Sequence, residues 1–175
     1  ILAVPDTIRA TDPWLLYWHG NCGVLSDPPK ARPFFEKAYD LFKQRNDRTG
    51  LFMSWAGIVD SYIHEWDTFV PLIKWIRKLK GLLKEERGFP MREVEVAVSV
   101  RMFNALYIIQ PSDRDIPLWE QKLAVFMKKS EDMNERMLLA SALLMYYAWR
   151  GDLDKMANLG AELNVVRGRI QESLL

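Results

Sequence analysis

The sequence is poor in the residues that form disulfides and zinc sites. Of its 175 residues one is cysteine, Cys22, and two are histidine. A single cysteine excludes an internal disulfide and fits a protein of the reducing cytoplasm. His64-Glu65 lacks the second histidine, four residues on, that the metalloprotease helix requires, and His19 belongs to a different segment. We therefore expect no metal ion and no cofactor.

An excess of charge of one sign and long apolar runs are also missing. Lys and Arg number 24 against 23 Asp and Glu, so no strong field attracts nucleic acid or an anionic membrane. The longest apolar runs, such as ERMLLASALLMYYAWRGD, fall short of the roughly 20 residues that cross a bilayer. We expect no membrane span and no direct nucleic acid binding by this segment, with any affinity for duplex DNA at about 10⁻⁴ M or weaker.

Catalytic groups do not occur at usable spacing. Cys22 lacks the basic neighbours that activate a thiol, and we expect it to be a buried structural residue. Glu93 and Glu95 lie two residues apart and point to different faces of a helix, so they cannot act as a carboxylate pair. The glycines of HGNCG are not followed by the Lys and the Ser or Thr of a phosphate-binding loop. We expect that the chain is not an enzyme.

The sequence does contain a succession of apolar-periodic stretches that predict helices. Short polar breaks such as RGFP, QPSDRD and KSEDMN separate these stretches, and no segment alternates strictly enough to predict a strand. Eight helices are expected: from Asp12, from after SDPP to Arg45, Leu51–Glu65, Thr68–Glu86, Met91–Gln110, Ile116–Lys129, Asn134–Arg150, and Leu153 to about Val166. Helix starts near 13, 51, 91 and 134 are spaced by about 40 residues, which favours four helical hairpins.

One stretch, DPPKARPFFEKAYDLFKQR, carries an unusual pattern of side chains. Ala31, Phe35 and Ala38 share one helical face, and the two small residues predict that the preceding helix of the same hairpin approaches closely. These residues, together with Tyr147-x-x-x-Gly151-x-Leu153, resemble the second-helix and corner positions of the tetratricopeptide repeat. The spacing here exceeds the 34 residues of that motif.

A second resemblance covers about residues 12 to 165. DPWLLYWHGNC, the stretch from DPPKARPFFEKAYDLFKQR on through RTGLFMSWAGIVDSYIHEWDTF, and LLMYYAWRGDLDKMANL resemble the helical-repeat region of large bacterial transcriptional regulators of the maltose-activator and antibiotic-regulator type. This resemblance implies a non-enzymatic protein–protein interaction or effector-sensing domain, with a nucleotide-dependent switch module and a DNA-binding domain elsewhere in the protein. A free-standing tetratricopeptide-like adaptor and a small helical enzyme are the alternatives.

The predicted fold is all-α, a right-handed superhelical stack of about four tetratricopeptide-like hairpins. We expect residues 1–175 to form a single helical-repeat domain, with a lead-in over 1–11, the hairpins over 12–166 and a tail over 167–175. Because the sequence begins at Ile1 and not at Met, we expect it to be a fragment of a larger protein.

The first helix of each hairpin lines the concave face of such a stack, and spacing from the close-packing positions selects its residues. They are Ser54, Ile58, Ser61, Asn104, Tyr107, Ser141 and Met145. Small, weakly polar and uncharged residues suit a protein partner, a neighbouring domain of the same chain or a small effector. Tight helix packing is the alternative explanation of the same residues.

The run KWIRKLKGLLKEERG is the most basic part of the chain. Its apolar positions, including Trp75, Ile76 and Leu79, predict the buried face of a helix. The cations are expected to form the solvated face: Lys74, Arg77, Lys78, Lys80 and Lys84. We also expect most of the seven tryptophans to lie in the core.

Overall fold

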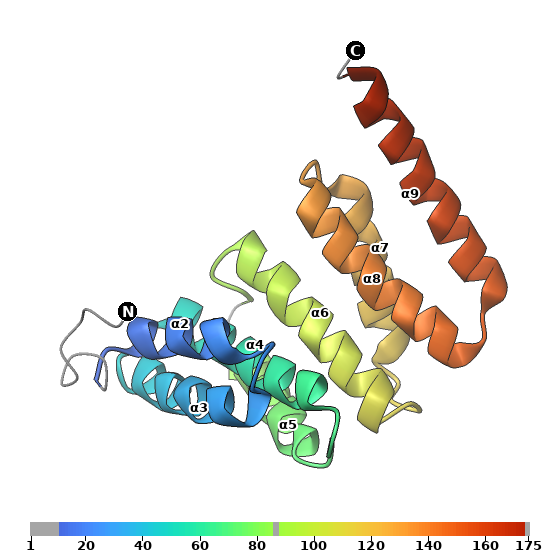
Figure 1. The fold of residues 1–175 in the computed structure, drawn as a ribbon. Coiled ribbons are helices and arrows are strands. Elements are labelled where there is room, and N and C mark those ends of the chain that lie inside the picture. The colour runs from blue at the N-terminus through green and yellow to red at the C-terminus, as the bar shows by residue number, and fades with distance from the viewer. Residues whose placement is uncertain (1–10, 86–87, 174–175) are drawn as a thin grey trace. The chain divides into compact units, whose positions relative to one another are not determined.

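The computed structural model describes residues 11–85 and 88–173, and within these ranges every regular element is an α-helix (Figure 1). The eight described helices are α2 (Pro13–Gly23), α3 (Pro28–Gln44), α4 (Arg48–Glu65), α5 (Leu72–Glu85), α6 (Arg92–Ile109), α7 (Ile116–Lys129), α8 (Met133–Arg150) and α9 (Leu153–Ser173). The predicted all-α class is therefore confirmed. None of these helices, over the residues described, is long and apolar enough to cross a membrane.

Aspartates fix several of the helix starts. Asp12, Asp27 and Asp47 each accept a hydrogen bond from the backbone N–H three residues on, at 2.9, 3.3 and 2.9 Å. These bonds satisfy N–H groups that the first helical turn leaves without a partner. Pro13 and Pro28 occupy first helical positions, where the missing N–H costs nothing.

Several helix boundaries differ from the prediction. α4 begins at Arg48 and not at Leu51, because Asp47 caps the helix three residues earlier than expected. α5 begins at Leu72 and not at Thr68, because Pro71 disfavours the helical conformation of the residue before it. The predicted end of this helix, Glu86, lies outside the described residues. α9 continues past Val166 to Ser173, over most of the predicted tail, where no proline interrupts it. Residues 1–10 of the predicted lead-in also lie outside the described part of the chain.

The chain divides into two compact units, residues 1–116 and 117–175. The first unit contains α2 to α6 and the second contains α8, α9 and all of α7 but its first residue. We describe each unit by itself, and a single domain over 1–175 stays a prediction.

The core of the first unit is built around α3 and α4. α3 packs against both α2 and α4, and α4 also packs against α6, while α5 contacts α4 and α6. The largest fully buried side chains of this unit include Trp55, Phe35, Phe42, Phe52 and Phe103. Neighbouring helices thus share one continuous aromatic core.

Phe35 explains the small residues of α3. Ala31, Phe35 and Ala38 are all buried. A Cβ atom added to Gly20 of α2 would lie 2.8 Å from the Phe35 ring, and one added to Gly57 of α4 would lie 2.5 Å from it. The preceding helix therefore approaches α3 as closely as predicted, and the following helix does so too. We call this arrangement of Gly20, Phe35 and Gly57 the glycine slot.

The prediction that Cys22 is buried is wrong, because its side chain is exposed. Cys22 follows Gly20 by two residues, which is about 200° around the helix. Since Gly20 faces Phe35, Cys22 points away from α3.

The prediction that most tryptophans lie in the core is also wrong. Only Trp55 and Trp75 are buried, whereas Trp18, Trp66 and Trp149 are each more than half exposed. Phenylalanine and tyrosine fill much of the core instead, so three large aromatic surfaces remain open to solvent.

Candidate functional site

The predicted binding residues of α4 lie inside the first unit. Ser54, Ile58 and Ser61 have no exposed surface. The Ser61 hydroxyl donates a hydrogen bond to the Ile58 carbonyl at 2.6 Å, and the buried Ser54 Oγ has no hydrogen-bond partner among the described residues. These three side chains are part of the core and present nothing to a ligand.

The predicted residues of α6 are also largely covered. Tyr107 is buried, and burial raises the pKa of its hydroxyl above the usual value. Asn104 is half-buried, and its buried Oδ1 accepts no hydrogen bond from the described part of the chain. Asn104 is therefore a polar group with an unused acceptor.

Ser141 and Met145, on α8 of the second unit, are exposed. The Ser141 hydroxyl donates to the Leu138 carbonyl at 2.8 Å. Met137 and Trp149 are also exposed and follow the same helical face at four-residue intervals, so this part of α8 is an uncharged apolar stripe. Four of the seven predicted residues are thus buried in the first unit, and a binding face shared by Asn104, Ser141 and Met145 stays a prediction.

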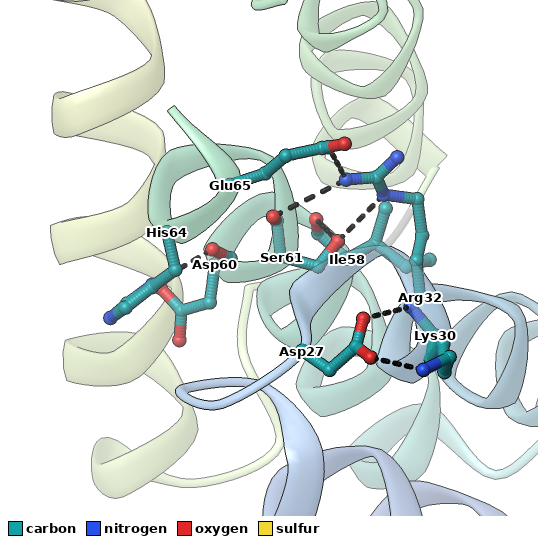
Figure 2. Close-up of polar contacts among 8 residues, drawn as sticks. All are labelled: Asp27, Lys30, Arg32, Ile58, Asp60, Ser61, His64 and Glu65. Atoms are coloured by element: carbon teal, nitrogen blue, oxygen red, sulfur yellow. Dashed lines mark hydrogen bonds and ion pairs between the residues drawn. The ribbon is translucent and has the colours of Figure 1, made fainter. Parts of the chain in front are cut away.

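A polar cluster that the sequence did not indicate joins α3 to α4 (Figure 2). Arg32 donates from Nε to the Ser61 hydroxyl at 2.9 Å and from its terminal nitrogen to the Ser61 carbonyl at 3.3 Å, and it forms an ion pair with Glu65. Its guanidinium also lies 3.6 Å from the centre of the Tyr62 ring. Glu65 is thus half-buried in a structural ion pair, whereas its neighbour His64 is exposed.

A second ion pair joins α4 to α6. Arg101 holds Asp60 with both Nε and a terminal nitrogen, at distances of 2.8 to 3.0 Å. Burial alone would lower the pKa of Arg101, but the Asp60 carboxylate outweighs it and raises that pKa. The backbone carbonyl of Asp60 also lies 2.8 Å from the Nδ1 atom of His64 (Figure 2). The Asp60–Arg101 ion pair fixes the register of α4 against α6.

The basic run forms the two-faced helix α5 that the sequence predicts. Trp75, Ile76 and Leu79 are buried, while Lys74, Arg77 and Lys84 are exposed. Lys78 is half-buried, with its ammonium 4.1 Å from the centre of the Trp75 ring and 4.8 Å from that of Tyr39. The aromatic rings therefore occupy one of the cations that an anionic partner would need.

Lys80, the next cation of α5, is held by two aspartates. Its ammonium lies 3.0 Å from an Asp113 oxygen and 2.6 Å from an Asp115 oxygen. Burial alone would lower the pKa of Lys80, but Asp115 and Asp113 outweigh it and raise that pKa. For Asp113, burial is outweighed by the Asp115 backbone N–H and the Lys80 ammonium, so its pKa is lowered. Lys80 therefore anchors the segment that follows α6.

The second unit contains a cavity of about 250 Å³ among α7, α8 and α9. Beside it the Tyr147 hydroxyl donates to Glu120 Oε1 at 3.1 Å, and Lys155 approaches the same oxygen at 2.7 Å. Burial and then Glu120 raise the pKa of Tyr147, so its hydroxyl stays protonated. Tyr147, Glu120 and Lys155 therefore form a structural hydrogen-bonded group and not a reactive pair.

Groups of three or more His, Cys, Asp or Glu side chains placed to hold a metal ion do not occur among the residues described. Comparisons of the chain with protein-family models, curated proteins and solved structures give no match. We therefore infer the function from the residues and from the packing of the helices.

Proposed function

We propose that this chain is the protein–protein interaction or effector-sensing domain of a cytoplasmic bacterial transcriptional regulator, built as a right-handed superhelical stack of about four tetratricopeptide-like hairpins. The observation that carries this proposal is the glycine slot. Phe35 sits where α2 and α4 approach α3, with space for its ring left by Gly20 and Gly57. Close approach of consecutive helices through small residues is what the resemblance to the tetratricopeptide repeat implies.

The packing order within the first unit supports a repeat arrangement. The first helices of successive predicted hairpins, α2, α4 and α6, contact one another in sequence, and α3 packs against α2 and α4. In solenoid proteins each repeat contacts its neighbours in this manner, and the exposed surface of the array binds partners.

Exposed apolar side chains supply the surface for a partner. Trp18 on α2 and Met145 and Trp149 on α8 each have about half of their area exposed. Tryptophan and methionine are enriched where proteins bind one another. Of the residues that spacing selected for the binding face, we retain Asn104, Ser141 and Met145.

Site-specific photocrosslinking in the full-length protein tests this role. A photoreactive phenylalanine analogue placed at Trp18 or Met145 should capture a protein partner or a neighbouring domain. The same analogue at Lys37 or Asp40, exposed on the outer side of α3, is the control and should capture much less. Equal capture at all four positions would contradict a defined binding surface.

The coding sequence on either side of this segment tests the regulator assignment. A nucleotide-binding loop upstream and a helix-turn-helix at either end support the regulator. A complete short reading frame instead supports a free-standing adaptor and contradicts the regulator.

A further inference from the structure

The cavity of the second unit has an apolar floor. Ala124 and Met127 of α7, Leu143 of α8 and Leu159 of α9 line it, and all except the half-buried Ala124 are buried. Its volume is about 250 Å³. An apolar cavity of ~150 Å³ already takes up benzene, so this one accommodates a phenyl ring or a branched aliphatic side chain.

Two opposite charges stand at the mouth of the cavity. Lys128 of α7 and Glu162 of α9 both line it and both are exposed. Neither side chain forms an ion pair or a hydrogen bond within residues 11–85 and 88–163, whose side chains the structure describes. Lys155, the other cation of the lining, is already neutralised by Glu120 at 2.7 Å. The mouth therefore offers one available cation and one available anion, on different helices.

An apolar floor with one free charge of each sign matches a small zwitterion with an apolar side chain. A lone carboxylate would leave Glu162 without a counter-charge, and a lone amine would leave Lys128 without one. Opposite charges across a site give specificity to the ligand that satisfies both.

We propose that this cavity binds an apolar α-amino acid, with its side chain on the floor between Met127 and Leu159, its carboxylate at Lys128 and its ammonium at Glu162. The inference deepens the proposed effector-sensing role and rests on it for its biological meaning. Binding itself is testable without any regulatory readout.

The test is a calorimetric titration of the 175-residue chain with four probes. L-leucine and L-phenylalanine carry both charges, 4-methylpentanoate lacks the ammonium, and 3-methylbutylamine lacks the carboxylate. We expect both amino acids to bind saturably and each single-charge probe to bind about fivefold more weakly than leucine, as screened contacts at an exposed mouth allow. Shifts of the Met127 methyl resonance on titration place the ligand in the cavity.

Charge-removing variants assign the two ends of the ligand. Lys128→Gln should weaken binding of leucine and 4-methylpentanoate but leave 3-methylbutylamine unchanged, and Glu162→Gln should show the converse. The matched controls are Lys129→Gln on α7 and Asp154→Asn on α9, exposed residues that do not line the cavity and should not alter binding.

Three results would overturn the proposal. Absence of saturable leucine and phenylalanine binding up to about 10 mM would exclude an amino acid site. Binding of 4-methylpentanoate as tight as that of leucine, with Glu162→Gln without effect, would exclude the zwitterion. Unchanged leucine binding by a folded Ala124→Met variant, whose longer side chain fills the cavity, would place the ligand elsewhere. Each of these leaves the crosslinking test of the proposed function unaffected, so the two can fail separately.

Discussion

Replacing Gly57 with alanine tests the glycine slot at its tightest point. The added Cβ would lie 2.5 Å from two atoms of the Phe35 ring, 0.9 Å short of the 3.4 Å at which ordinary van der Waals contact begins. A Cβ atom added at Gly20 would lie 2.8 Å from the same edge of the Phe35 ring, so the ring is also confined on the side of α2. The ring is fully buried, so it has little room to move away from Gly57.

The expected magnitude is the difference between two opposing effects. Alanine is favoured over glycine in a helix interior by about 1 kcal/mol. Overpacking a close-packed core costs about 1 to 3 kcal/mol and is expected near the upper end here, because the overlap is with a fixed aromatic ring. Gly57→Ala should therefore lower the free energy of unfolding by about 1 to 2 kcal/mol.

Gly81 provides a matched control within the same unit. It lies inside α5, and a Cβ at this position would meet no atom within 4 Å. Gly81→Ala should therefore raise the free energy of unfolding by about 0.5 to 1 kcal/mol, since only the helix propensity changes. The same substitution is thus expected to have opposite signs at two helical glycines.

Urea unfolding followed by tryptophan fluorescence measures both variants, because Trp55 lies on α4 and is fully buried. The double variant Phe35→Leu/Gly57→Ala should lose less free energy of unfolding than the two single variants lose together. The difference should be at least about 0.5 kcal/mol. If Gly57→Ala is as stable as Gly81→Ala, the ring does not restrict the helix approach and the slot argument is wrong.

Two further predictions concern contacts of α5. Lys80→Met should lose about 0.5 to 1 kcal/mol of unfolding free energy near neutral pH. This difference should shrink as pH falls through the lowered pKa of Asp113, below its usual 3.8. It should vanish as pH rises through the raised pKa of Lys80, above 10.5. A pH-independent difference in urea unfolding contradicts the prediction. Trp55→Phe removes the buried hydrogen bond from the Trp55 indole to the Trp75 carbonyl, 2.8 Å long, at a cost of about 1 to 2 kcal/mol. Its melting temperature should fall by about 2 to 8 °C, whereas that of Trp18→Phe should not change.

The helices could be predicted from the sequence because the signals that start and stop them are local. Asp12, Asp27 and Asp47 each precede a helix and cap it through a bond to a residue three positions on. The starts of α5, placed four residues too early, and of α4, placed three residues too late, also had local causes in Pro71 and in Asp47. Secondary structure in this chain follows from interactions within a few residues.

The candidate site could be predicted only in part, because burial depends on distant helices. Ser54 and Ile58 have the small or apolar character expected of a binding face, but α4 is packed against both α3 and α6 and no side of it near these residues remains open. Met145 has the same character on α8 and is exposed. The sequence close to Ile58 and the sequence close to Met145 do not show that the first residue is buried and the second exposed.

The ion pairs were missed for the same reason, and they show how α4 is joined to its neighbours. α4 contacts α2 and α3 through the glycine slot, in which the Phe35 ring lies against two glycines. α6 contains no glycine. Arg101 instead reaches Asp60, 41 residues earlier in the chain, and holds it at 2.8 Å. α4 and α6 are therefore held together by a charged pair in addition to their packed helix surfaces. Loss of the Asp60–Arg101 pair is therefore expected to loosen α6 from α4 while leaving the glycine slot intact.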